Sequence, residues 1–159
     1  MTEDSPEQLQ QWMQLALDQA RLAQAAGDVP IGAVVAHQGR IVASAFNRRI
    51  IAADPTAPAE MLAIRSAAAA LSDWRLTGCT LVVTLEPCCM CAGAIVLARI
   101  DRLVYGAADP KAGAVDSLYR LCGDPRLNHQ VQVVAGVRAD DCGRALTEFF
   151  RTQRALGKK

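Results

Sequence analysis

The sequence predicts an α/β protein, specifically a three-layer α/β/α sandwich around a central five-stranded mixed sheet. One observation is the run at residues 80–85, Thr-Leu-Val-Val-Thr-Leu, which is typical of a strand buried on both faces of a sheet. A second is the order of elements around it, a helix and a hairpin followed by alternating helices and strands. With 159 residues, 52% of them apolar, the chain is expected to fold as a single domain over 1–159, with short tails at 1–5 and 157–159.

The first elements are expected to be a helix and a β-hairpin. The segment Ser5-Pro6-Glu7-Gln8 has the pattern of an N-cap, a proline at the first helical position and a capping-box residue. Apolar residues then recur every three or four positions as far as Gly27, which fits a glycine just beyond a helix end. Two apolar stretches, 31–36 and 40–46, follow closely on one another and predict a hairpin.

Helices and strands are expected to alternate along the rest of the chain. Pro87 suits the first turn of a helix, where its missing N–H costs nothing, so a helix is expected to start there, directly after the buried strand. The other expected elements are a helix at 56–71, a strand at 102–106, a short helix near 117–121, a strand at 130–135 and a last helix from about 140 to 156.

Composition and charge exclude several classes of protein. The net charge is only +1, so binding to nucleic acid would need a local basic patch. One such patch starts at Arg144, where five basic residues and one acidic residue flank two phenylalanines. No apolar run approaches the roughly 20 residues needed to span a bilayer, and the polar N-terminus is unlike a signal peptide. A cytoplasmic protein without a membrane partner is therefore expected.

Cysteines at the start of the third helix are the candidate metal ligands. Cys88 and Cys91 are three residues apart, so both thiols can converge on one point in a first helical turn, where the helix dipole favours their thiolate forms. Six cysteines, three of them crowded together, favour a metal site over a disulfide framework. The pair supplies only two of the three protein ligands that a catalytic zinc usually takes.

Four further stretches carry a resemblance to a known family. Asp-Pro-Thr-Ala-Pro-Ala-Glu at 54–60 and Pro-Cys-Cys-Met-Cys at 87–91 resemble the zinc deaminase signature, H-x-E followed by P-C-x-x-C. With Gly-Ala-x-Asp-x-Lys-x-Gly at 106–113 and Phe-Phe-Arg at 149–151, the chain is similar to bacterial tRNA-specific adenosine deaminases over about 8–155. The resemblance implies a cytidine-deaminase-like fold, a homodimer, one zinc per chain, and conversion of adenosine to inosine at the wobble position of a tRNA anticodon.

The resemblance also implies roles for individual residues. Cys88 and Cys91 would bind zinc, which makes hydroxide available to attack C6 of adenine. Glu60 would carry protons between that water, the ring and the leaving ammonia, and Asn47 would bind the flipped base. The residues expected to contact the tRNA anticodon stem-loop are Asp109, Lys111, His129 and Phe149.

Pro58 departs from the signature, because it stands at the position of the zinc-binding histidine and has no lone pair to offer a metal. Four outcomes are open. Zinc is held weakly with an extra water; Glu60 moves onto the zinc; Cys89 or a histidine replaces the missing ligand; or the chain is a metal-free scaffold.

The predicted function is therefore zinc-dependent hydrolytic deamination of tRNA adenosine. One alternative is a nucleobase or nucleoside deaminase, and another is a catalytically silent homologue that acts as an RNA-binding or partner subunit. A thioredoxin-type redox pair is disfavoured, because Asn47 and Glu60 would then have no purpose.

Overall fold

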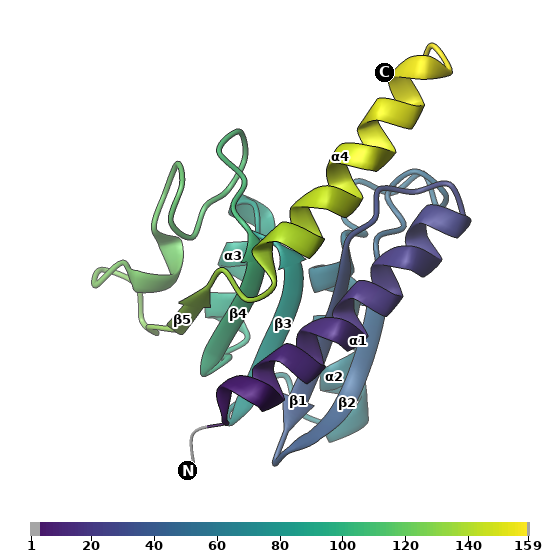
Figure 1. Ribbon diagram of the computed structural model, residues 1–159. Coiled ribbons are helices and arrows are strands. Elements are labelled where there is room, and N and C mark those ends of the chain that lie inside the picture. The colour runs from purple at the N-terminus through teal and green to yellow at the C-terminus, as the bar shows by residue number, and fades with distance from the viewer. Residues whose placement is uncertain (1–3, 159) are drawn as a thin grey trace.

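The computed structural model describes residues 4–158, which form one five-stranded mixed sheet between two layers of helices (Figure 1). The strand order is β2-β1-β3-β4-β5; β1 runs antiparallel to β2 and β3, and β3, β4 and β5 are parallel. The predicted sandwich is confirmed, and the outermost parts of the expected tails, residues 1–3 and 159, lie outside the described residues. The strands are β1 Gly32–His37, β2 Arg40–Phe46, β3 Cys79–Leu85, β4 Arg102–Ala107 and β5 Gln132–Ala135.

Helices cover both faces of the sheet. Those of the described chain are α1 Pro6–Ala25, α2 Ala59–Leu71, α3 Cys89–Leu97 and α4 Ala139–Ala155. Because side chains alternate along a strand, Val82 packs with α1 and α4 on one face, whereas Leu81 packs with α2 and α3 on the other (Figure 1). The apolar run in β3 is therefore buried on both sides, as its sequence predicts. No helix in the described part of the chain has the length and apolar character needed to cross a membrane.

The N-terminal helix and the hairpin match their predictions. Ser5 caps α1, and its Oγ accepts a hydrogen bond from the backbone N–H of Gln8 at 3.1 Å. Gln38 and Gly39 join β1 to β2 with positive φ angles of 52° and 75°, the pattern of a type I′ turn. Helix α1 lies so close to β1 that a Cβ on Gly32 would come within 1.9 Å of the Ala16 carbonyl oxygen. The sequence therefore tolerates only glycine there.

Two helices begin later than predicted. Helix α2 starts at Ala59 and not at 56, so Pro58 is its N-cap, and α3 starts at Cys89 and not at Pro87. At α2 a residue that precedes proline is disfavoured in helical conformation, which keeps Ala57 out of the helix. At α3 the cause is different, because Cys88 itself is extended, with φ −76° and ψ 179°, and serves as the N-cap. Upstream of α2, the Asp54 side chain also accepts hydrogen bonds from the Thr56 N–H and hydroxyl, which fixes a turn in place of a helical start.

The predicted short helix at 117–121 is wrong. The structure has a loop there, followed by a 3₁₀ turn at Leu121–Gly123. The backbone N–H groups of Val115, Asp116 and Ser117 converge on the side chain of Glu86, which holds this segment in an irregular conformation. The loop consequently lies against the start of α3, where Ala114 N–H donates to the Pro87 carbonyl at 2.9 Å.

Candidate functional site

The structure brings three of the predicted site residues together where β3 ends. Strand β3 leads through Glu86 and Pro87 into α3, which places Cys88 at the N-cap and Cys91 in the first turn. Helix α2 starts nearby and carries Glu60 in its own first turn. The Cys91 thiol contacts both the Cys88 sulfur and the Glu60 carboxylate. Two helix N-termini therefore deliver two sulfurs and one carboxylate to a common point.

The two cysteines have opposite proton affinities. The hydrogen bond from the Cys91 thiol lowers the pKa of Cys88 to about 5, and backbone N–H groups at the start of α3 add to this effect. That same hydrogen bond, together with burial, raises the pKa of Cys91 far above its ordinary value. The hydrogen bond between the two groups therefore favours a thiolate at Cys88 and a thiol at Cys91.

Glu60 is a buried carboxyl group whose hydrogen bonding is incomplete. Only 5% of the residue is exposed, and within the described residues its Oε1 has no hydrogen-bond partner. Burial raises the pKa of Glu60 to about 7. A carboxyl group in this state can both accept and release a proton near neutral pH, as a general acid–base group must.

A cavity of about 330 Å³ is lined in part by Asn47 and Arg49, whereas Glu60 and the two cysteines do not line it. The charge of Arg49 lowers the proton affinity of Glu60, so one residue of the cavity wall acts electrostatically on the buried carboxyl group. Asn47 is 1% exposed, and its Nδ2 donates to Asp28 at 2.9 Å. The predicted base-binding residue therefore borders a cavity whose wall also carries Arg49, a charge that acts on the predicted proton carrier.

The donors present do not complete a zinc site. Among residues 4–158, no group of three or more His, Cys, Asp or Glu side chains is arranged to hold a metal ion, even though Glu60 adjoins both thiols. Position 58 carries a proline in extended conformation at the N-cap of α2, and it offers no donor atom. A catalytic zinc takes three protein ligands. Cys88 and Cys91 are thus two ligands of an incomplete set.

Neither histidine can supply the third ligand within one chain. His37 ends β1 and pairs with Cys79, the first residue of β3, whereas the two cysteines follow the last residue of that strand. Seven residues of strand span roughly 20 Å. His129 lies before β5, and its Nε2 hydrogen-bonds the Ile100 carbonyl at 2.7 Å, also at the starting end of the parallel strands. Cys89 is exposed and α3 turns it away from the buried Cys91.

The residues expected to contact RNA do not form one cluster in a single chain. The Asp109 side chain accepts hydrogen bonds from the backbone N–H groups of Lys111 and Ala112, within the loop that follows β4. Lys111 is exposed beside it, whereas His129 lies at the opposite end of β4, where that strand starts. Phe149 is 5% exposed, and its neighbour Phe150 is 45% exposed. Phe150 is therefore the ring that a base could reach, and an RNA contact by Phe149 stays a prediction that its burial does not favour.

Two buried carboxylates near the site were missed by the sequence analysis. Glu86 accepts hydrogen bonds from the backbone of Asp109, Val115, Asp116 and Ser117 and from the Ser117 hydroxyl. Asp28 accepts four hydrogen bonds and is fully buried. Each is an acid placed directly beside an apolar strand or a helix end, which was the signal available in the sequence.

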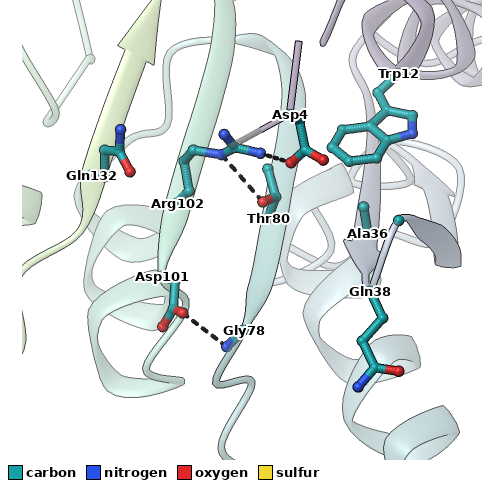
Figure 2. Close-up of a pocket in the computed structure, with 10 residues that line it drawn as sticks. Asp4, Trp12, Ala36, Gln38, Gly78, Thr80, Asp101, Arg102 and Gln132 are labelled. Carbon is teal, nitrogen blue, oxygen red and sulfur yellow. Dashed lines mark hydrogen bonds and ion pairs between the residues drawn. The ribbon is translucent and has the colours of Figure 1, made fainter. Parts of the chain in front are cut away.

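A second cavity, of about 430 Å³, lies at the opposite end of the strands, where β3 and β4 start (Figure 2). Figure 2 shows Arg102 between Thr80, whose hydroxyl accepts its Nε–H at 3.3 Å, and Asp4, with which it forms an ion pair. Gly78 and Asp101 border the same space at the starting ends of β3 and β4. None of the predicted site residues lines it, so its larger volume does not identify it as the catalytic site.

Comparison with known proteins adds sequence relationships to this geometry. Residues 6–107 match the family model of the cytidine and deoxycytidylate deaminase zinc-binding region. The chain is 48% identical over 147 residues to the tRNA-specific adenosine deaminase of Bacillus subtilis, covering 92% of this chain and 91% of that protein. It is 45% identical to the tRNA-specific adenosine deaminase of Haemophilus influenzae, over 89% of this chain and 83% of the relative.

Solved structures with the same fold support the same family relationship. One, from work on A-to-I editing by tRNA:A34 deaminases at the wobble position of transfer RNA, superimposes with a TM-score of 0.82 at 47% identity, covering 86% of this chain and 99% of that one. A guanine deaminase from Nitrosomonas europaea matches with a TM-score of 0.78 at 25% identity, over 94% and 86% of the two chains. The chain belongs to the cytidine and deoxycytidylate deaminase family and, within it, to the tRNA-specific adenosine deaminases.

Proposed function

We propose that this chain deaminates adenosine to inosine at the wobble position of a tRNA anticodon. The observation that carries the proposal is Glu60, a buried carboxyl group with a free oxygen, placed against a cysteine pair in a chain that is 48% identical to a tRNA-specific adenosine deaminase. Deamination replaces an amino group by oxygen from water, so it needs a group that takes a proton from water and returns one to the leaving nitrogen. Glu60, with a pKa of about 7, meets that requirement.

The remaining site residues receive roles that fit their positions. Asn47 lines the 330 Å³ cavity and would bind the base once it has left its stack. The exposed Lys111 would contact a phosphate, and Phe150 offers a partly exposed ring for stacking. Arg151 and Arg154 extend the basic surface along α4. Asp109 would hold the loop that presents Lys111, because its carboxylate already organises that backbone.

The metal is the point at which this sequence departs from its family. The proposed ligands are Cys88 and Cys91, and residues 4–158 provide no third ligand beside them. Loss of a direct ligand costs more than the 10- to 100-fold in affinity that follows from changing a residue behind a ligand. We therefore expect the chain to hold little zinc when it is purified without added metal. Its activity should be limited by that deficiency and not by the rest of the scaffold.

A homodimer is part of the proposal. Helix α3 exposes Met90 and Leu97, at 37% and 69%, and the loop after β4 exposes Leu118 and Tyr119, at 54% and 57%. Exposed apolar side chains of this number on neighbouring segments are typical of surfaces that another protein covers. Sedimentation equilibrium should give twice the chain mass, and Leu97→Glu should shift it toward the monomer; a wild-type monomer at micromolar concentration would contradict this part of the proposal.

The decisive experiment restores the missing donor. The Pro58→His variant should bind about one zinc per chain and should raise inosine formation in an anticodon stem-loop at least tenfold over the wild type. Pro58→Ala is the matched control, because it removes the proline without adding a ligand, and it should change neither quantity. In the Pro58→His background, Glu60→Gln should retain the zinc and lose the activity.

The activity of the Pro58→His variant distinguishes a deaminase from a protein that only binds RNA. If the Pro58→His variant holds zinc and still forms no inosine, the deaminase assignment fails. If it is active while the wild type only binds the stem-loop, the wild-type chain is a binding scaffold that has lost one ligand at position 58. An unrelated hairpin at the same salt concentration is the reference for binding, because phosphate contacts alone give salt-dependent affinity for any RNA.

A further inference from the structure

Asp28 is a carboxylate buried completely between the end of α1 and the start of β1. Its Oδ1 accepts hydrogen bonds from Val29 N–H at 2.8 Å and from Asn47 Nδ2 at 2.9 Å. Its Oδ2 accepts from the N–H groups of Ile50 at 2.8 Å and Ile51 at 3.1 Å. A buried charge needs such donors to offset its desolvation, and here they come from three different segments.

These contacts fix the orientation of the Asn47 side chain. A carboxylate can only accept hydrogen bonds, so the amide must turn its nitrogen, and not its oxygen, toward Asp28. The amide nitrogen has two hydrogens, and one bond to Asp28 leaves the other free. The Asn47 Oδ1 is buried and has no partner within the described residues. One donor and one acceptor of the same amide therefore remain beside the cavity that Asn47 lines.

Asp28 also anchors a wall of that cavity. Ile50 and the neighbouring Arg49 line it, and the two backbone N–H groups bound by Asp28 belong to this segment. The same segment contacts the start of α2, where Arg48 N–H donates to the Ala57 carbonyl at 3.0 Å. One carboxylate thus links the orientation of Asn47 to the position of the loop that carries Arg49, whose charge acts on Glu60.

We propose that Asp28 is a positioning residue that makes the site selective for adenine by holding the Asn47 amide with its oxygen and one N–H toward the base. The inference rests on the proposed function and adds a determinant of specificity to it. An amide in this orientation matches the adjacent amino group and ring nitrogen N7 of adenine, a donor and an acceptor that asparagine reads as a pair. A purine with a carbonyl at C6 would place an acceptor against the Asn47 oxygen.

The test compares binding of the wild-type chain to three anticodon stem-loops that differ only at the target base. One carries adenosine, one carries 7-deazaadenosine, which lacks N7, and one carries purine riboside, which lacks the amino group. Each analogue removes one bond of the pair, and we expect adenosine to bind about tenfold more tightly than either, within the range for a bidentate base contact. Asp28→Asn should reduce both ratios to about twofold or less, because an amide partner lets Asn47 flip.

Two further variants separate positioning from mere structural support. Asp28→Glu retains the carboxylate and should retain the preference for adenosine. This variant still tests the proposal if Asp28→Asn does not fold. The exchanged pair Asp28→Asn/Asn47→Asp restores a donor–acceptor contact but leaves only acceptors toward the base, so it should lose the discrimination against 7-deazaadenosine and keep that against purine riboside. A residue that only supports the fold would weaken binding of all three RNAs equally.

The outcomes distinguish this inference from the proposed function. Wild-type binding that exceeds that of an unrelated hairpin but does not differ among the three bases overturns the inference and leaves tRNA binding in place. The inference is also overturned if the affinity of adenosine relative to each analogue is the same in the wild type and in Asp28→Asn. Absence of specific stem-loop binding by the wild type refutes the proposed function, and the inference falls with it.

Discussion

Replacing Glu86 by glutamine tests how the loop beside the cysteines is held. The carboxylate is 2% exposed and accepts four backbone N–H groups and one hydroxyl. Burial alone would raise its pKa, but hydrogen bonds from Asp116, Ser117 and Asp109 outweigh this effect and lower the pKa to about 2. At about 1.4 kcal/mol for each tenfold change in proton affinity, the difference from the ordinary value of 4.5 corresponds to about 3 kcal/mol of stability.

Glutamine has nearly the shape of glutamate, but only its amide oxygen accepts hydrogen bonds, whereas both carboxylate oxygens of Glu86 accept them. If its oxygen takes the three N–H groups of 115–117, its NH₂ group faces the Asp109 N–H, which is then buried without a partner. We therefore expect Glu86→Gln to lower the free energy of unfolding by about 3 kcal/mol at pH 7, measured by urea denaturation. The exposed Glu148→Gln on α4 is the control and should change it by less than about 0.5 kcal/mol.

The dependence on pH provides the sharper check. A carboxyl group whose pKa is lower in the folded state stabilises the protein above its unfolded pKa and loses that contribution as the pH falls toward the folded value. The difference between wild type and Glu86→Gln should therefore be constant above pH 5, fall below half by pH 3, and largely vanish near pH 2. A difference that stays constant across this range, or one below about 1 kcal/mol at pH 7, would refute the account of Glu86.

Two smaller predictions concern local packing. Gly113→Ala would put a Cβ at 2.3 Å from the Glu86 carboxyl carbon, so it should destabilise the chain by about 1–3 kcal/mol. Gly93→Ala in α3 is the control, because its Cβ meets nothing within 4 Å, and it should leave the melting temperature unchanged or raise it. Ser5→Ala removes the hydrogen bond to Gln8 and should cost about 1 kcal/mol, while Ser5→Asp should not; equal losses for both would show that the cap does not contribute.

The sequence predicted the sheet and its layers well because they depend on local patterns. The apolar run of β3, the capping segment at Ser5 and the apolar periodicity of α1 are each complete within a few residues. Sequence alone places the start of α2 too early, because a proline also disfavours a helical conformation in the residue before it. The start of α3 is set by the extended conformation of Cys88, which no local pattern indicates. The conformation of the loop after β4 could not be predicted either, since Glu86 determines it from 23 to 31 residues away.

The same distinction applies to the site. Glu60, Cys88 and Cys91 were found because their short motifs lie at helix starts that point to one place. Asp28 was missed because its partners Asn47, Ile50 and Ile51 are 19 to 23 residues along the chain, and no local pattern relates them. Residues that act by positioning others are set by long-range contacts. A motif search therefore finds the groups that react and omits those that orient them.

Pro58 shows why a fold can survive the loss of a ligand unchanged. The residue at the N-cap of α2 has φ −63° and ψ 159°, and proline prefers this extended conformation. An N-cap N–H has no partner within its own helix, so its absence in proline costs little. The backbone therefore accepts proline without strain, and Glu60 still lies beside the thiol of Cys91. Measurements of stability or of the fold would therefore not reveal that a zinc ligand is missing. The zinc content of the Pro58→His and Pro58→Ala variants would reveal it.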